Sequence, residues 1–126
     1  MGRKTVIAGN WKMFKTQSEA VELVKALQAE VEGYDEVEVV ICPAFTSLAK
    51  VNQLLQGSTI QLGAQDVYWE DEGAYTGQIS VSMLQDCGCR YVIIGHSERR
   101  QYFNETDESV NRKLKKILEK IGRAHV

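Results

Sequence analysis

Short runs of β-branched and apolar residues alternate with amphipathic helical patterns four times along this 126-residue chain. The predicted strands span residues 5–8, 37–42, 60–64 and 91–94, and the predicted helices span residues 16–31, 46–55, 80–86 and 106–118. The first run shows no polar alternation, which is typical of a strand buried on both faces. Strands and helices in this order predict an α/β fold, with a parallel sheet covered by helices.

The first helix has the clearest boundaries. Thr16 and Glu19 have the spacing of a capping box, and Gly33 follows the last apolar position as a stop signal. The last helix has an apolar stripe formed by Val110, Leu114, Ile117 and Leu118. We interpret the basic residues between 112 and 120 as the solvated face of that helix rather than as a nucleic-acid or lipid patch.

The pattern alone leaves two architectures open: an open doubly wound sheet, or part of a (β/α)8 barrel. A chain of 126 residues is long enough for one domain with its own core. The dinucleotide fingerprint G-x-G-x-x-G does not follow the first strand, and no Walker A loop occurs in the sequence. These two nucleotide-binding motifs therefore give no support to a nucleotide-binding function.

Composition narrows the class of protein. The net charge of −2 gives no electrostatic footprint for nucleic acid, and no apolar run approaches the roughly 20 residues of a membrane span. The apolar run 6–8 is too short for a signal peptide, so we expect a cytoplasmic location. Cys42, Cys87 and Cys89 are expected to be structural thiols, because no second Cys/His pair at ligand spacing supports a metal site.

Two strand ends have chemically useful side chains. The first strand leads into Asn10-Trp11-Lys12, whose lysine could hold a phosphate or stabilise an oxyanion, or could equally be an ordinary surface lysine. Chemistry in parallel α/β folds collects at the carboxyl ends of strands.

The fourth strand leads into Gly95-His96-Ser97-Glu98-Arg99-Arg100. His96 could act as an acid–base or electrophilic group, and Glu98 could pair with Lys12 across the strand ends. The alternative is a buried histidine next to a structural ion pair. A metal site at His96 and Glu98 lacks a third ligand.

Four strings in this order and spacing resemble signatures of the triosephosphate isomerase family. They are Gly9-Asn10-Trp11-Lys12-Met13, Ala64-Gln65-Asp66, Gly73-Ala74-Tyr75-Thr76-Gly77-Gln78-Ile79-Ser80 and Ile94-Gly95-His96-Ser97-Glu98-Arg99-Arg100. The resemblance extends over residues 4–120. It implies the first four β/α units of a (β/α)8 barrel, with residues 1–120 as the N-terminal half of that domain.

The resemblance also implies a reaction. The family interconverts dihydroxyacetone phosphate and D-glyceraldehyde 3-phosphate through an enediolate, in glycolysis and gluconeogenesis, without cofactor or metal. Asn10 and Lys12 would contact the phosphorylated triose, His96 would be the catalytic electrophile, and Glu98 would support Lys12.

Partner contacts follow from the same resemblance. The family is usually a homodimer, and the segment 65–78 resembles the loop that joins its subunits. Thr76 would cross into the partner's site, and Gln65 would belong to the same dimer loop. No nucleic acid and no membrane is expected as a partner.

The sequence departs from the family at its end. A complete barrel needs about 250 residues, and the catalytic glutamate of the family is not among these 126, so we expect the chain to be inactive alone. Residues 121–126 do not resemble the approach to a fifth strand and are expected to be a non-native tail. The alternatives are a non-catalytic half barrel that binds phosphate or self-assembles, and a flavodoxin-like sheet that binds a phosphorylated cofactor.

Overall fold

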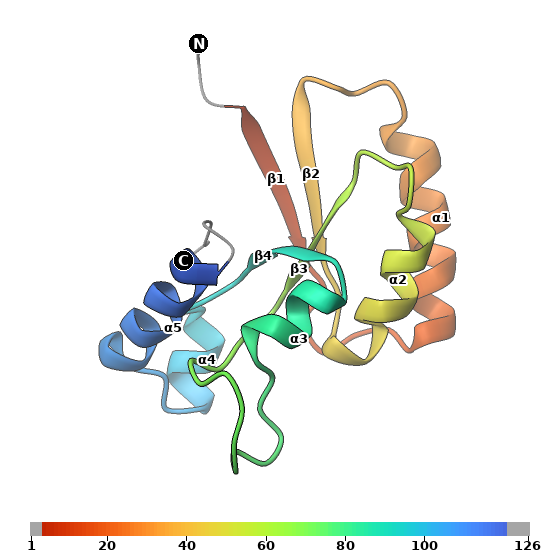
Figure 1. Ribbon diagram of the computed structural model, residues 1–126. Helices are drawn as coiled ribbons and strands as arrows, with labels where there is room; N and C mark the ends of the chain where they lie inside the picture. The colour runs from red at the N-terminus through yellow and green to blue at the C-terminus, as the bar shows by residue number, and fades with distance from the viewer. Residues whose placement is uncertain (1–3, 121–126) are drawn as a thin grey trace.

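The computed structural model describes residues 4–120. The strands are β1 (Thr5–Asn10), β2 (Val37–Cys42), β3 (Gln61–Ala64) and β4 (Cys89–Val92). The helices are α1 (Gln17–Val31), α2 (Leu48–Leu54), α3 (Val81–Asp86), α4 (Ser97–Tyr102) and α5 (Asp107–Lys120), with a 3-10 turn at Phe45–Ser47. The strands are parallel and lie in the order β1-β2-β3-β4, as the first half of a (β/α)8 barrel requires (Figure 1). The sheet is open, and the predicted fold class is confirmed.

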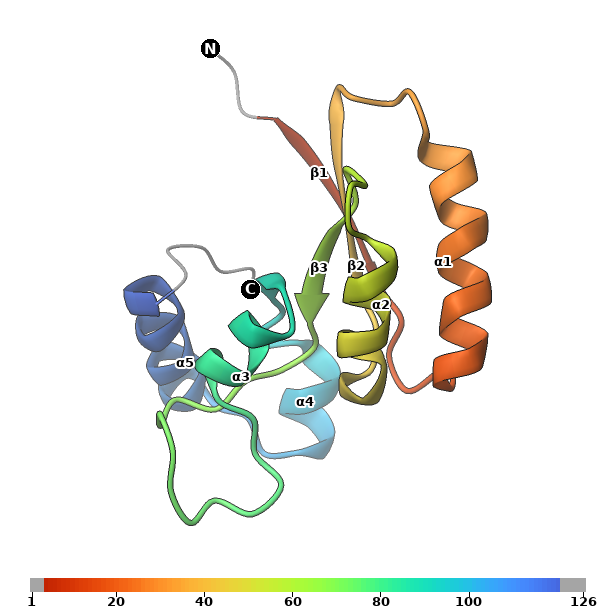
Figure 2. The same cartoon turned by 45° about the vertical axis from the view of Figure 1, so that its right-hand side comes forward.

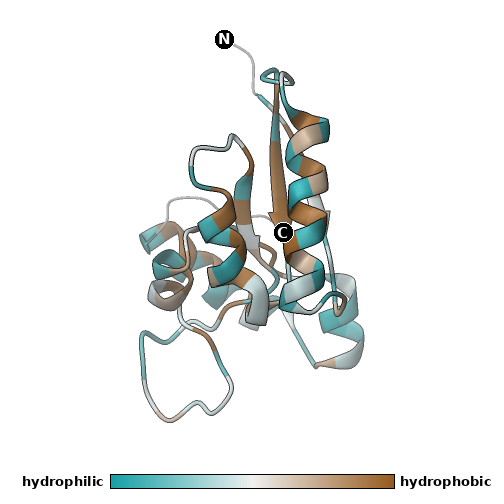
Figure 3. Ribbon diagram, turned by 90° about the vertical axis from the view of Figure 1, so that its right-hand side faces the viewer, coloured by the Kyte–Doolittle hydropathy of each residue, from teal (hydrophilic) through white to brown (hydrophobic). Residues whose placement is uncertain are grey.

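The main core lies between the sheet and its helices. Its fully buried side chains include Val24, Leu48, Val51, Val67, Val81, Leu84, Val92, Ile94 and Ile117. A smaller cluster on the opposite face of the sheet joins Val40, Cys42 and Tyr91. Figure 3 shows the corresponding pattern, in which β2 is strongly hydrophobic and α1 has both hydrophobic and hydrophilic residues. Helices α1, α2, α3 and α5 thus each bury one stripe in the core, whereas α4 has no buried residue.

Helix α1 begins and ends where the sequence predicts. The Thr16 hydroxyl accepts a hydrogen bond from the Glu19 amide at 3.4 Å, and the Glu19 carboxylate accepts one from the Thr16 amide at 3.0 Å. Gly33 follows the helix with a φ of +91°, which glycine adopts without steric cost. The predicted capping box is confirmed.

Two strand predictions need correction. Strand β1 is not buried on both faces, because its residues are exposed or half-buried along its whole length and Ile7 is 58% exposed. Strand β4 begins at Cys89, two residues earlier than predicted, because Gly88 completes the turn with a φ of +85°. Its pairing with Leu62 of β3 then starts at once.

Helix α5 also differs from the prediction on one point. Lys113 is buried rather than solvated, because it lies on the same side of the helix as Val110 and Ile117 and its ammonium is bound by carboxylates. Leu118, which the sequence places in the apolar stripe, is 50% exposed.

The carboxyl ends of the strands share one end of the molecule. Figure 2 shows α4 and the loop between β3 and α3 at that end.

Within residues 4–120 no helix is both long and apolar enough to cross a membrane. The tail predicted at residues 121–126 lies outside the described residues.

Candidate active site

A cavity of about 340 Å³ opens at the carboxyl ends of the strands. Five of the six predicted site residues line it: Asn10, Lys12, Gln65, His96 and Glu98. They come from the last residue of β1 and from the segments that follow β1, β3 and β4, which the sheet brings to one edge. The sixth, Thr76, is not among the lining residues and is exposed in the loop.

Lys12 is held in a strained backbone conformation. Its φ is +55°, a left-handed value that costs free energy for a residue with a side chain. The Asn10 side chain stabilises this turn, because its Oδ1 accepts a hydrogen bond from the Lys12 amide at 2.9 Å. The Lys12 ammonium donates to Glu98 Oε2 at 2.8 Å, which is the pairing that the sequence analysis expected.

Gln65 ties the ends of the strands together. Its Nε2 donates to the carbonyl of Lys12 at 2.9 Å and to the carbonyl of Cys42 at 2.9 Å. Gln65, at the start of the loop, therefore lines the cavity, whereas Thr76 lies in the exposed part of that loop.

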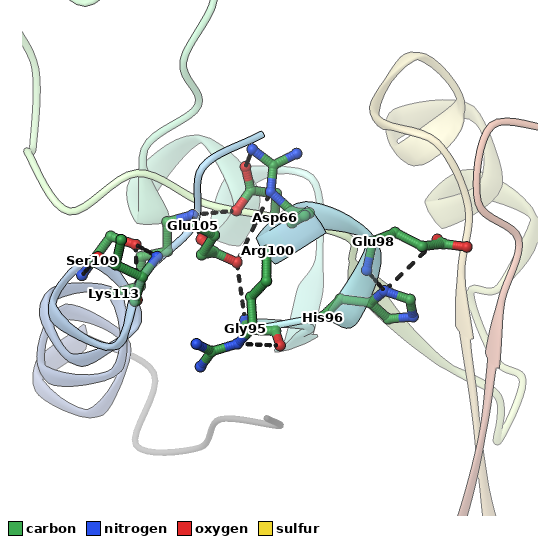
Figure 4. Close-up of polar contacts among 10 residues, drawn as sticks. Asp66, Gly95, His96, Glu98, Arg100, Glu105, Ser109 and Lys113 are labelled. Atoms are coloured by element: carbon green, nitrogen blue, oxygen red, sulfur yellow. Dashed lines mark hydrogen bonds and ion pairs between the residues drawn. The ribbon is translucent and has the colours of Figure 1, made fainter. Parts of the chain in front are cut away.

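His96 caps helix α4. Its Nδ1 accepts a hydrogen bond from the Glu98 amide at 3.1 Å, so this nitrogen bears no proton. The 3.6 Å contact between Nδ1 and Glu98 Oε1 is therefore not an ion pair. In the neutral imidazole the proton lies on Nε2, the ring nitrogen that makes no contact with Glu98 (Figure 4), and His96 lines the cavity.

Glu98 is kept ionised by its surroundings. The hydrogen bond from the Lys12 side chain lowers the pKa of the Glu98 carboxyl, and the charge of Lys12 acts in the same direction. Partial desolvation opposes these effects but does not outweigh them. The site thus contains an ammonium–carboxylate pair and a neutral imidazole.

Sequence reasoning missed an ion network beside the cavity, in which Lys113 and Glu105 are buried while Asp66 and Arg99 are half-buried and line the cavity. Lys113 Nζ lies 2.7 Å from Asp66 Oδ1 and is also bound by Glu105, while Arg99 Nη2 lies 3.0 Å from Asp66 Oδ2. The signal available in the sequence was Lys113, a cation on the apolar stripe of its helix. Glu105 gave no signal, because its burial depends on the tertiary fold.

The long loop after β3 is ordered by its own aromatic side chains. The ring centroids of Tyr68 and Trp69 lie 4.2 Å apart, and those of Tyr68 and Tyr75 lie 4.9 Å apart. The Tyr68 amide also donates to the carbonyl of Ile79 at 2.8 Å. Packing of this kind explains how an irregular segment can keep a defined shape.

No cluster of three or more His, Cys, Asp or Glu side chains suitable for a metal ion occurs in residues 4–120. The three cysteines are free thiols, and Cys42 and Cys89 are buried.

Comparison with known proteins assigns the family. Residues 5–122 match the family described as Triosephosphate isomerase. The chain is 60% identical over 116 residues to the triosephosphate isomerase of Endomicrobium trichonymphae, covering 92% of this chain and 46% of that protein. It is 56% identical over 117 residues to that of Dictyoglomus turgidum, covering 93% and 47%. The chain thus spans about half the length of the curated relatives it matches, and over that half it belongs to the triosephosphate isomerase family.

Proposed function

We propose that this chain supplies the substrate-binding and electrophilic half of an active site that interconverts dihydroxyacetone phosphate and D-glyceraldehyde 3-phosphate. The observation that carries the proposal is the convergence of Lys12 and His96, from strands β1 and β4, on one cavity. The names of the relatives support the same reaction.

Each side chain has a separate task in this reaction. The Lys12 ammonium attracts the phosphate and the carbonyl oxygen of the triose, where negative charge develops as the enediolate forms. The Nε2–H group of His96 donates to that carbonyl oxygen and carries a proton between the two enediolate oxygens. Asn10 holds the Lys12 turn in place through its hydrogen bond to the Lys12 amide.

Proton abstraction from carbon needs a carboxylate that is free to accept it. Among the described residues, the carboxylates that line the cavity are Asp66 and Glu98. Asp66 is bound by Arg99 and Lys113, and Glu98 is bound by Lys12. We therefore expect the 126 residues alone to show no isomerisation above background, with the base supplied by the half of the family that this chain does not match.

A chimera tests the proposal. The second half of the Endomicrobium trichonymphae relative, joined after Lys120, should restore isomerase activity, measured by a coupled assay with dihydroxyacetone phosphate. The separate 126-residue chain serves as the inactive reference. A folded chimera without activity would contradict the assigned substrate. Activity in the separate chain would show that its 126 residues already contain a base.

Substitutions in the chimera test the individual roles. His96→Gln and Lys12→Met should each lower kcat/KM by about 10²–10³-fold, which is typical of losing one donor to a developing oxyanion. Lys15→Met is the matched control, because Lys15 is also a nearby lysine with positive φ but does not line the cavity. Equal activity of all three variants would exclude the proposed roles.

A homodimer through the loop is part of the proposal. It is supported by apolar side chains that are exposed near the cavity, including Met13, Phe14, Tyr102 and Phe103. Thr76 lies in the exposed loop, where it could enter a second copy. Cytoplasmic location and a place in glycolysis remain predictions from the sequence.

A self-assembling half barrel that binds phosphate is the second candidate. It is favoured by the open sheet, in which, over the described residues 4–120, β1 pairs with β2 alone. Binding of inorganic phosphate by an assembled 126-residue chain, together with an inactive chimera, would favour this candidate over the isomerase.

A further inference from the structure

The short segment that delivers His96 to the cavity passes through Gly95. This glycine has a φ of +69°, and an added Cβ would lie 3.3 Å from Arg100 Nη2 and 3.3 Å from Val110. The backbone is therefore in close contact with α4 and α5 immediately before the imidazole. Any movement of the Gly95 peptide would change the aim of the next side chain.

The amide of Gly95 is bound by a buried carboxylate. Glu105 Oε2 accepts a hydrogen bond from this amide at 3.1 Å, and the Glu105 side chain is only 2% exposed (Figure 4). The other oxygen, Oε1, accepts a hydrogen bond from the Lys113 ammonium. Both hydrogen bonds involve the charged Glu105 carboxylate, and a charge-assisted hydrogen bond is roughly twice as strong as one between neutral groups.

The carbonyl of Gly95 is bound as well. Arg100 Nε donates to it at 3.1 Å, and Arg100 Nη1 lies 2.8 Å from Asp107 Oδ1. Both polar groups of Gly95 thus bind ionised side chains that lie outside strand β4. These two bonds hold the peptide from which His96 projects, and an electrophile must be aimed at its substrate.

A purely structural ion pair would not explain the arrangement. Lys113 is also bound by Asp66 at 2.7 Å, so it would keep a carboxylate partner without Glu105. Replacing a buried pair by apolar side chains is often neutral or stabilising, so stability alone is a weak reason for its presence. What Glu105 adds beyond the pair is the acceptor for the Gly95 amide.

We propose that Glu105 is a positioning residue for His96: its carboxylate, oriented by Lys113, fixes the Gly95 peptide and thereby presents the Nε2–H tautomer of His96 to the cavity. The proposal rests on the proposed function for the electrophilic role of His96. It concerns geometry that exists whether or not substrate turns over.

The test is nitrogen-15 NMR of the 126-residue chain. In the double variant Glu105→Leu/Lys113→Met, which removes both charges together, the Gly95 amide should exchange with solvent at least about tenfold faster. The His96 ring should lose its single Nε2–H tautomer and show a mixture. A folded double variant with unchanged Gly95 exchange and an unchanged tautomer would overturn the proposal.

Two further variants make the test decisive. Glu108→Leu/Arg112→Met removes an exposed ion pair of the same helix and should leave both readouts unchanged. Glu105→Gln keeps an acceptor, so it should preserve the tautomer while the Gly95 amide exchanges faster through a weaker bond. If the first double variant does not fold, unchanged Gly95 exchange in Glu105→Gln overturns the proposal.

These readouts need no substrate. An inactive chimera would contradict the proposed isomerase function but would not change the NMR result. A change in activity would likewise not count as evidence for the positioning role of Glu105. Failure of the positioning role and failure of the proposed function are therefore distinguishable.

Discussion

The ammonium of Lys12 and the carboxylate of Glu98 meet across the ends of β1 and β4, 86 positions apart in the sequence. Both side chains are partly exposed, at 48% and 43%, so the pair contributes little to stability and is more important for fixing the Lys12 ammonium. The hydrogen bond from Lys12 lowers the pKa of the Glu98 carboxyl.

The Lys12–Glu98 pair predicts a pH effect. Because the pKa of Glu98 is lowered on folding, its contribution to stability is present above the ordinary value of 4.5 and is lost as the pH falls through the lower folded value. Carbon-13 NMR should show Glu98 titrating below 4.5, and Lys12→Met should raise its pKa. Lys15→Met should leave it unchanged; an equal shift in both variants would exclude a specific pair.

The three cysteine thiols differ in burial and therefore in their expected reactivity. Desolvation raises the pKa of Cys42 and of Cys89 to about 12, and it also raises that of Cys87, which is only partly buried. Since the thiolate is the reactive form, a thiol reagent at pH 8 should modify Cys87 first, and Cys42 and Cys89 only on unfolding. Cys87→Ser should abolish the early phase. Rapid labelling of that variant in the folded state would contradict the buried placement.

At the scale of elements, helix α1 begins at the capping box that its local sequence predicts. The capping box satisfies backbone donors at the first turn, and hydrogen bonds from the Thr16 amide and side chain lower the pKa of Glu19. Such signals are readable because the partners lie within three residues of each other.

The cap of α1 gives a stability prediction. Thr16→Ala should lower the free energy of unfolding by about 1 kcal/mol, because the amide of Glu19 loses its acceptor. Ser18→Ala, in the same turn, should change it by less than about 0.5 kcal/mol. Urea unfolding followed by circular dichroism measures both. A larger loss in Ser18→Ala than in Thr16→Ala would contradict the cap.

At the scale of the whole molecule, the open sheet is the dominant feature. Among residues 4–120, β1 pairs with β2 alone, so its outer edge has no strand partner there, and Ile7 exposes more than half of its surface. A strand edge with apolar side chains is a template for pairing with another chain. In a closed barrel such an edge would be absent.

We therefore expect the 126-residue chain to self-associate. Ile7→Lys should reduce association in analytical ultracentrifugation, because a charge on an edge strand opposes pairing. Tyr34→Lys, at an exposed position that belongs to no strand, is the matched control. A compact monomer at all concentrations would contradict the expectation, and equal effects of the two variants would place the contact elsewhere.

Sequence by itself determined the alternation of strands and helices, the α1 cap and the two strand ends that meet in the cavity. These features depend on short-range periodicity and on the rule that parallel strands end at one edge. Tertiary structure alone decided the exposure of β1, the start of β4 at Cys89 and the burial of Lys113 and Glu105. The physical reason is that burial of a charge or of a strand face depends on which distant segments pack against it, and no local pattern encodes that contact.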